Sequence, residues 1–140
     1  MSRKPPRENK PNADPFSEAL ARIEQARETG ATELDLSGLG LTELPEAIGQ
    51  LTQLQKLDLH NNQLMTLPEW LGQLTQLREL NLDFNQLTTL PESLGQLTQL
   101  RELNLSDNQL TALPESLRRL KSLEKLFLHG NELLTIPTEV

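Results

Sequence analysis

The sequence has no cysteine, and only 3% of its residues are aromatic. Without cysteine the chain forms no disulfide, offers no thiolate to a metal and has no cysteine nucleophile. Its 140 residues are long enough for one domain, yet a compact core of that size normally uses more aromatic side chains. With so few rings and so many leucines, the composition indicates a core built from regular leucine layers.

Long apolar runs are also missing. The N-terminal stretch "MSRKPPRENKPNADP" is basic and proline-rich but has no apolar segment, so it does not have the form of a secretory signal. No stretch approaches the roughly 18 consecutive apolar residues that suggest a membrane-spanning helix. We therefore expect a cytoplasmic protein without a membrane partner, in which residues 1–15 form a disordered tail.

Positive charge is scarce outside this tail. The net charge is −7, from 13 Lys and Arg against 20 Asp and Glu. Residues 1–15 hold four of the cations and two of the anions, or +2, which leaves nine against eighteen, or −9, for residues 16–140. Because an acidic body repels phosphate backbones, we expect no nucleic-acid partner.

The chain is rich in an internal repeat. The stretch "RELNLDFNQL", Arg78 to Leu87, recurs as "RELNLSDNQL", Arg101 to Leu110. Each repeat reads L-x-x-L-x-L-x-x-N-x-L and then L-P-x-x-L-x-x-L. Five such units of period 23 fill residues 31–140, the last of them truncated. They begin at Ala31, Leu54, Leu77, Leu100 and Leu123.

Each unit predicts a short strand followed by a short helical return. Leu80 and Leu82 alternate with polar residues, as in a strand with one buried face. In "LPESLGQL", residues 90–97, the leucines are spaced by four and three, which is a helical period. Pro91 suits the first helical position. Stacked units would place their strands in a parallel sheet, with continuous leucine layers between the sheet and the returns.

An asparagine column completes the repeat. Asn62, Asn85, Asn108 and Asn131 hold the ninth position, whereas the first unit has Leu39 there. An amide side chain both donates and accepts hydrogen bonds. We expect the column to satisfy backbone groups where the chain leaves each strand.

Residues 16–30 predict an amphipathic helix that caps the first repeat. Asp14 is a candidate N-cap, Pro15 fits the first helical position, and Gly30 suits the C-cap. One face would cover the first leucine layer and the other is charged. The predicted apolar stripe consists of Phe16, Leu20, Ile23 and either Ala26 or Arg27, with Ala19 beside them.

The pattern over residues 31–140 resembles the leucine-rich repeat family, and the stretch "LPESLGQLTQLRELNL" resembles its intracellular signalling repeats. The resemblance implies an α/β fold: a right-handed solenoid with parallel strands on the concave face and short helical or irregular returns on the convex face. It also implies a non-enzymatic protein-interaction module that binds another protein on the concave face and needs no cofactor.

An alternative function follows from a narrower resemblance. The lead-in "ALARIEQARETGATELDLSGLGLTELP" and the ending "LFLHGNELLTIPTEV" look like the repeats of bacterial Roco proteins, which precede a Ras-like GTPase and a dimerising COR domain. The sequence has no G-x-x-x-x-G-K-[ST], so any GTPase chemistry would belong to a longer parent chain. The domain would then be its regulatory or sensing segment. Val140 ends the chain without a polar cap, so a missing domain or self-association would cover this end.

The seventh position gives a row of Ser37, His60, Asp83, Ser106 and His129. Its first three members resemble a nucleophile, a base and an orienting acid. An open sheet, however, offers no oxyanion hole or water-excluding pocket, so we expect no catalytic residue. The two histidines are three repeats apart, roughly 14 Å, which is too far to share a metal ion. We do expect Asp83 to raise the pKa of His60.

Two phenylalanines stand in columns that are otherwise polar or glycine. Phe84 holds the eighth position, and Phe127 holds the fifth, where the other units have Asp or Asn. The letters that differ between the two copies, Asp83/Phe84 and Ser106/Asp107, are those available for recognition. An exposed aromatic pair on a sheet is a typical binding anchor. The predicted protein-binding residues are His60, Asn81, Asp83, Phe84, Asn104, Asp107, Phe127 and His129.

The returns also differ between copies. Trp70 replaces the small residue of the other units, and we expect it to pack on the convex surface against Pro68 or a neighbouring return. Arg118, Arg119 and Lys121 form a basic run, which we interpret as a solvated face with a possible acidic partner as the alternative.

Overall fold

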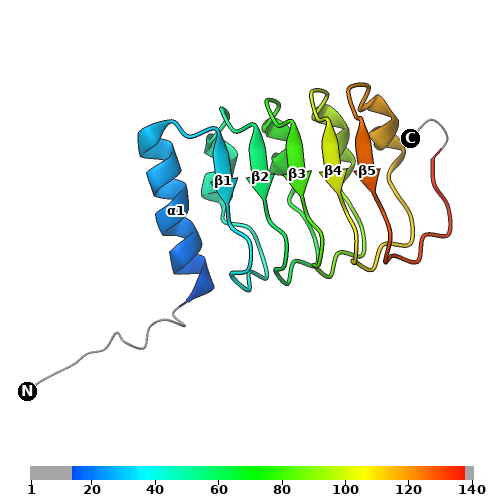
Figure 1. Cartoon of the computed structure of the whole chain (residues 1–140), viewed down its shortest axis with the longest axis horizontal. Helices are drawn as coiled ribbons and strands as arrows, with labels where there is room; N and C mark the ends of the chain where they lie inside the picture. Colours follow the sequence, from blue (N-terminus) through cyan, green and yellow to red (C-terminus); the bar gives the residue numbers. More distant parts are fainter. Residues whose placement is uncertain (1–13, 138–140) are drawn as a thin grey trace, which may run out of the picture.

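The computed structural model describes residues 14–137, in which one helix precedes five short strands that stand side by side (Figure 1). The predicted tail lies outside the described residues except for Asp14 and Pro15, which cap and begin the helix. Helix α1 spans Pro15–Thr29, and the strands are β1 Glu33–Asp35, β2 Lys56–Asp58, β3 Glu79–Asn81, β4 Glu102–Asn104 and β5 Lys125–Phe127. Four returns are 3₁₀-helices: η2 Glu46–Gln50, η3 Glu69–Gln73, η4 Glu92–Gln96 and η5 Glu115–Arg119.

The strands form one parallel sheet in the order β1-β2-β3-β4-β5. Every pairing joins residues one repeat apart, so Leu57 lies beside Leu80 and Leu80 beside Leu103. This register keeps each column of the sequence as a row across the sheet. The predicted solenoid is confirmed, with the strands on its concave face and the 3₁₀-helices behind them (Figure 1).

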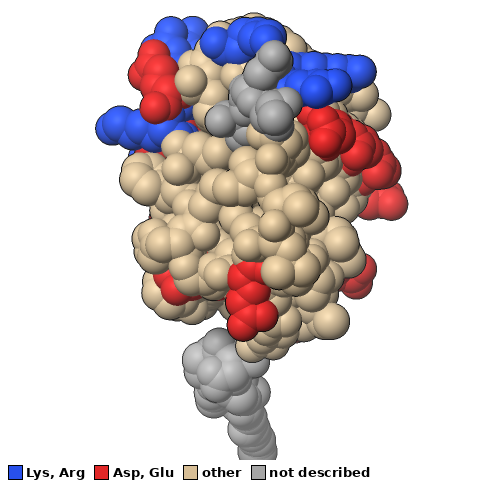
Figure 2. Space-filling model, turned by 90° about the vertical axis from the view of Figure 1, so that its right-hand side faces the viewer, with Lys and Arg blue, Asp and Glu red and all other residues tan. Residues whose placement is uncertain are grey.

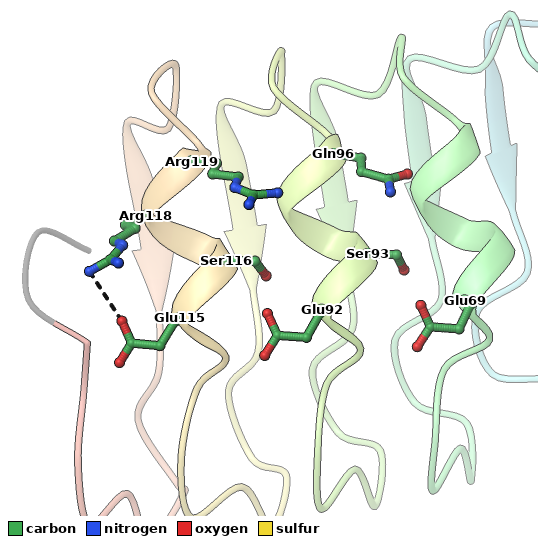
Figure 3. A pocket seen from close by; sticks show the side chains of 8 residues that line it. All are labelled: Glu69, Glu92, Ser93, Gln96, Glu115, Ser116, Arg118 and Arg119. Atoms are coloured by element: carbon green, nitrogen blue, oxygen red, sulfur yellow. Dashed lines mark ion pairs between the residues drawn. The ribbon is translucent and has the colours of Figure 1, made fainter.

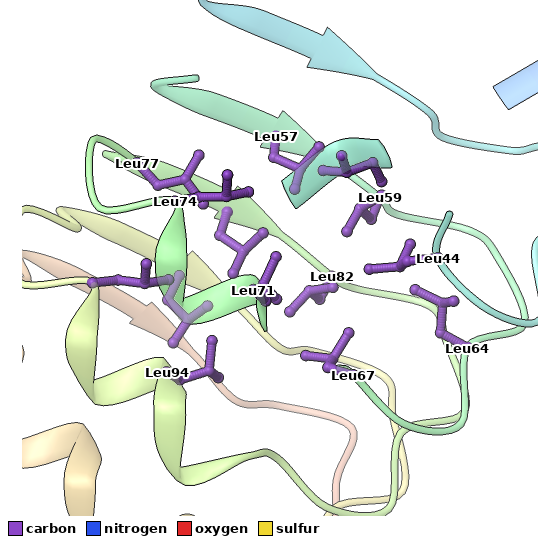
Figure 4. Close-up of a cluster of buried hydrophobic side chains, with 14 of the residues drawn as sticks. Leu44, Leu57, Leu59, Leu64, Leu67, Leu71, Leu74, Leu77, Leu82 and Leu94 are labelled. Atoms are coloured by element: carbon purple, nitrogen blue, oxygen red, sulfur yellow. The ribbon is translucent and has the colours of Figure 1, made fainter. Parts of the chain in front are cut away.

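The core consists of the leucine columns between the sheet and the returns (Figure 4). In the third repeat all seven column positions are buried. The fifth repeat is more open, since Ile136 is exposed and its other column residues are only partly buried: Leu123, Leu126, Leu128 and Leu133. Burial is therefore shared between neighbouring units, because each leucine layer is covered by the layers on either side. The seven buried residues of the third repeat are Leu77, Leu80, Leu82, Leu87, Leu90, Leu94 and Leu97.

The asparagine column forms a hydrogen-bonded ladder along the inside of the turn that follows each strand. Asn108 accepts the N–H of Leu87 at 3.0 Å through Oδ1. Its amide donates to the carbonyl oxygens of Leu82 and Leu105, both at 3.0 Å. Asn62, Asn85 and Asn131 make the equivalent bonds. The column thus satisfies backbone groups where the chain leaves each strand, as expected, and each asparagine also ties its own repeat to the one before it.

Helix α1 covers the first repeat through one narrow face. The Asp14 carboxylate accepts the N–H of Phe16 at 3.0 Å, and Gly30 ends the helix with φ of 67°. Ala19, Ile23 and Ala26 are buried. Leu20, predicted to belong to this stripe, is exposed instead. The buried face follows steps of three and four from Phe16, and Leu20 lies at its rim. Within residues 14–137, no helix is long and apolar enough to cross a membrane.

The 3₁₀-helices of neighbouring repeats pack at very short range. A Cβ added to Gly95 would lie 2.6 Å from the Ser116 carbonyl oxygen, and one added to Gly72 would lie 2.5 Å from that of Ser93. Trp70 packs on the preceding return, as expected, because a Cβ on Gly49 would lie 3.2 Å from its ring. Pro91 was predicted to be the first residue of its helical return, but it is the N-cap, and η4 begins one residue later at Glu92.

A first prediction concerns the ladder. Replacing Asn108 with alanine would leave the buried N–H of Leu87 without a partner. It would also remove one of the two amide donors from each of the Leu82 and Leu105 carbonyl oxygens, which keep only Asn85 and Asn131. The change should cost about 3 kcal/mol of unfolding free energy. Asn131 makes the same bonds but is partly exposed, so water can replace the amide and Asn131→Ala should cost about 1 kcal/mol. Urea unfolding measures both values. Equal losses would mean that the buried backbone groups do not depend on the ladder.

A second prediction concerns the returns. Gly95→Ala should destabilise the protein by about 3 kcal/mol, because the added methyl meets backbone and the neighbouring Cβ. Gly49→Ala is the matched control, since its methyl meets only the Trp70 ring, which can shift. Urea unfolding of both variants is the measurement. If Gly49→Ala were the more damaging, close backbone approach would not be the constraint on this column.

Candidate functional site

The concave face is formed by the outward-pointing residues at the fifth, seventh and eighth positions of the repeats. The fifth position ends each strand, and the other two lie where the chain turns away from the sheet. The fifth-position residues are Asp35, Asp58, Asn81, Asn104 and Phe127. The seventh-position residues are Ser37, His60, Asp83, Ser106 and His129, and the eighth-position residues are Gly38, Asn61, Phe84, Asp107 and Gly130.

Four fifth-position side chains hold the turn that follows them. The Oδ1 atoms of Asp35, Asp58, Asn81 and Asn104 accept the backbone N–H two residues ahead, at 2.9, 3.2, 3.3 and 3.1 Å. This is the local Asx bond that favours these residue types in turns. Asn81 and Asn104, predicted only as binding residues, therefore also hold their turns. Asp or Asn at the fifth position of the first four repeats was the signal for this role.

Phe127 cannot make this bond, because its side chain has no oxygen. Phe127 is 38% exposed, which agrees with the prediction that it faces solvent, and it lies on the end strand β5. A ring at this place therefore omits one hydrogen bond that the other four repeats make.

The eighth position is left-handed in every repeat. Gly38 and Gly130 have φ of 69° and 77°, and Asn61 and Asp107 have φ of 59° and 57°. Glycine, asparagine and aspartate are the residues that tolerate this region. Phe84 also adopts it, with φ of 56°, although a bulky side chain is strained there. Its ring is 57% exposed, so core packing does not account for its presence.

His60 pairs with a residue of its own repeat, at the end of strand β2. Its Nδ1 lies 2.6 Å from Oδ1 of Asp58. That hydrogen bond is the largest cause of a raised His60 pKa, and the charge of Asp83 adds a smaller effect in the same direction. The expected influence of Asp83 is thus confirmed in sign, but the main partner was missed. Residues 58 and 60 both point outward, and this alternation was the signal for their contact.

The row of Ser37, His60 and Asp83 does not form a relay. The Ser37 hydroxyl donates to Asp35 at 2.6 Å. A different trio meets further along: Ser106 Oγ lies 3.1 Å from His129 Nδ1, and His129 Nε2 lies 3.6 Å from Asp107 Oδ2. Ser106 was expected to be available for recognition, but it is only 2% exposed because it lies beneath this neighbour. A substrate could not reach its oxygen, so the trio does not present an accessible nucleophile.

No group of three metal-binding side chains occurs among residues 14–137. The convex side has a hollow of about 390 Å³ over the returns η3, η4 and η5 (Figure 3). Ser93 and Ser116 point from their helices into the gaps between successive returns (Figure 3). Their hydroxyls are buried without a hydrogen-bond partner among the described residues. The lining residues are Glu69, Glu92, Ser93, Gln96, Glu115, Ser116, Arg118 and Arg119.

This hollow follows from how the returns pack. Only small residues fit where Ser93 and Ser116 meet Gly72 and Gly95, and a serine in that place is shielded from solvent. Arg118, part of the predicted basic run, pairs with Glu115 of its own return at 3.2 Å. The accessible wall is therefore ordinary charged surface, and the concave face remains the candidate site.

Comparison with known protein families agrees with this geometry. Residues 33–132 match the model described as a leucine-rich repeat region. The chain belongs to the leucine-rich repeat family. The matched residues include all five strands and four returns of the leucine-rich repeat domain. No curated protein matches the chain.

Two solved structures show which proteins this leucine-rich repeat domain resembles. A Leptospira interrogans leucine-rich repeat protein is 50% identical, with a TM-score of 0.69 over 71% of this chain. A Shigella effector leucine-rich repeat domain is 28% identical, with a TM-score of 0.72 over 87% of this chain. The chain spans 26% and 50% of the length of these two structures.

A third prediction follows from the His60 pair. Because its folded pKa lies above the ordinary 6.5, protonated His60 stabilises the fold; this contribution is complete below pH about 6.5 and is lost as pH rises through the folded value. Asp58→Asn should return the pKa of His60 toward 6.5, and Asp83→Asn should lower it less. An NMR titration of the imidazole, with His129→Gln to assign the signals, measures this order. A larger drop in Asp83→Asn would show that the Asp58 bond is not the main cause.

Proposed function

We propose that this leucine-rich repeat domain is a non-enzymatic interaction module that binds another protein on its concave face, with Phe84 as the central anchor. Membership of the family supports the interaction role, since its repeated strands present an extended row of side chains to a partner. The setting we propose is the cytoplasm. The single observation that carries the proposal is the conformation of Phe84.

Phe84 opposes the needs of the scaffold. A left-handed backbone costs a residue with a side chain roughly 1–2 kcal/mol, and the other four repeats avoid that cost with Gly, Asn or Asp. The ring recovers little in exchange, because more than half of it is exposed. Strain of this kind is concentrated at functional sites, where the side chain serves a ligand. A large rigid ring in solvent is also the residue type that dominates binding energy in interfaces.

Phe127 supports the same surface. It forgoes the Asx bond of its column, worth about 1 kcal/mol, and lies two strands from Phe84, about 10 Å across the sheet. Between and beside the rings lie polar groups that could orient a partner. We propose His60, Asn81, Asp83, Asn104, Asp107 and His129 for that role, with the oxygens of the two asparagines already engaged in their turns.

The alternative is that the domain is the sensing segment of a larger Roco-type GTPase. What supports it is the resemblance of the lead-in and the ending to bacterial Roco repeats, together with the fact that both similar structures are longer than this chain. The same concave face would then serve a partner, or the GTPase, of the parent protein. A downstream reading frame encoding a phosphate-binding loop and a Ras-like domain would decide for this alternative, and a stop codon after Val140 would decide against it.

A fourth prediction tests the anchor. Phe84→Asn and Phe84→Gly should be more stable than Phe84→Ala by about 1 kcal/mol in urea, because alanine keeps the left-handed strain and the other two relieve it. Phe84→Asn should also capture roughly tenfold less partner protein from lysate than the wild type does. Leu20→Ala is the control, since it removes an exposed apolar side chain from α1. If Phe84→Asn still captured the partner proteins and Leu20→Ala did not, the concave site would be refuted.

A further inference from the structure

The lysines and arginines of the repeats are confined to one edge, where they are mixed with acids. From the fifth to the thirteenth position of all five units there is no lysine or arginine. Viewed from the C-terminal end, Lys and Arg gather along the upper edge, whereas the lower part shows only acidic charge among neutral atoms (Figure 2). The acids of this half are Asp35, Glu43, Asp58, Asp83, Asp107 and Glu132. The cations of the other edge are Lys56, Arg78, Arg101, Arg118, Arg119, Lys121 and Lys125.

Most acids of the concave face already have partners. Asp35 accepts two bonds from Ser37, and Arg22 of α1 reaches the carbonyl oxygen of the same residue at 2.9 Å. Asp58 pairs with His60. Asp107 lies 3.6 Å from a ring nitrogen of His129. Asp35 and Asp58 therefore each accept a hydrogen bond from within the domain, whereas Asp107 has only the longer contact with His129.

Asp83 differs from them. Its carboxylate is half-buried, and Oδ1 has neither solvent contact nor a hydrogen bond from the described residues. Oδ1 itself is out of reach of a partner, but Asp83 as a whole is only partly buried, so a cation can approach the carboxylate from its solvent side and offset the cost of desolvating it. Asp83 directly precedes Phe84, so this carboxylate and the strained, exposed ring lie at one point of the turn.

Resting on the proposed function, we propose that the partner presents an arginine-bearing extended segment, whose guanidinium lies on the Phe84 ring and faces the Asp83 carboxylate. A guanidinium can stack on an aromatic face and donate to a carboxylate at the same time. The surrounding half of the face repels no cation, since it has no lysine or arginine of its own. The mixed charges on the opposite edge give no such preference, because Glu79 pairs there with Lys56.

The test uses the ¹⁵N-labelled full chain and the peptide acetyl-(Gly-Arg)₃-amide, followed by amide shifts. Saturable shifts should centre on residues 81–85, weaken as salt is added, and be absent with the uncharged citrulline version. Asp83→Asn and Phe84→Asn should each weaken binding by about threefold or more. Glu92→Gln is the matched control, because it removes one carboxylate from the convex side and should leave binding unchanged.

Three results would overturn the inference. Equal weakening in Glu92→Gln and Asp83→Asn would mean general attraction to an acidic protein. Equal binding of the citrulline peptide would mean that charge is not recognised. Shifts around Phe84 on deleting residues 1–13, with no peptide present, would mean that the basic tail of the chain itself occupies the face.

The outcome is separable from that of the proposed function. In one outcome, capture of partner proteins from lysate is lost in Phe84→Asn, yet is neither weakened by Asp83→Asn nor competed by the arginine peptide. That result would support binding on the concave face and reject the arginine-bearing partner. Capture that is unaffected by Phe84→Asn would reject the module itself.

Discussion

The asparagine ladder is the constraint on which the rest of the structure depends. An asparagine at the ninth position reaches the backbone inside the turn only if the chain reverses sharply just before it. The left-handed residue at the eighth position provides this reversal in the four repeats that carry the asparagine, and Gly38 makes the same turn before Leu39 in the first repeat. The ladder satisfies buried backbone groups that the short strands leave open, so its geometry is repeated without change from Asn62 to Asn131. It thereby decides which residue types are acceptable at the neighbouring position.

Once the scaffold's requirements are known, departures from them become informative. The Leu columns, the ladder and the glycines of the returns are fixed by packing, so their recurrence carries no information about a ligand. Phe84 adopts a left-handed backbone that is strained for its side chain, whereas the other repeats have Gly, Asn or Asp there. Phe127 lacks the Asx bond that the other four repeats make. An exposed ring that costs stability requires a reason outside the fold, and recognition is the reason that fits an open sheet.

The sequence predicted what depends on periodicity. A period of 23 with fixed leucines defines the sheet, its register and its core, because each column must remain a row when units stack. The sequence did not predict features of single side chains that depend on contacts with residues distant in the sequence or on the direction of the side chain. Leu20 has the spacing of a buried residue but lies at the rim of α1, and Ser106 occupies an outward column but is covered by His129. His60 bonds to Asp58 of its own repeat and not to a residue of the next one. Such details depend on side-chain directions that periodicity does not specify.

The position of Phe84 in the stack also has a physical reason. In a repeat protein each unit is held by its own energy and by the interfaces with its neighbours, so an end unit is held from one side only. The third repeat, like the second and the fourth, has a covered leucine layer on both sides and is fully buried in its column positions, whereas the fifth is partly open. A cost of roughly 1–2 kcal/mol in the backbone can be tolerated in an interior unit of this kind, because two interfaces would have to open to relieve it. At the open end the same strain would favour fraying. In the fifth repeat the departure is milder, because Phe127 costs only one hydrogen bond. The proposed binding surface therefore places the larger cost in an interior repeat and the smaller cost in the end repeat.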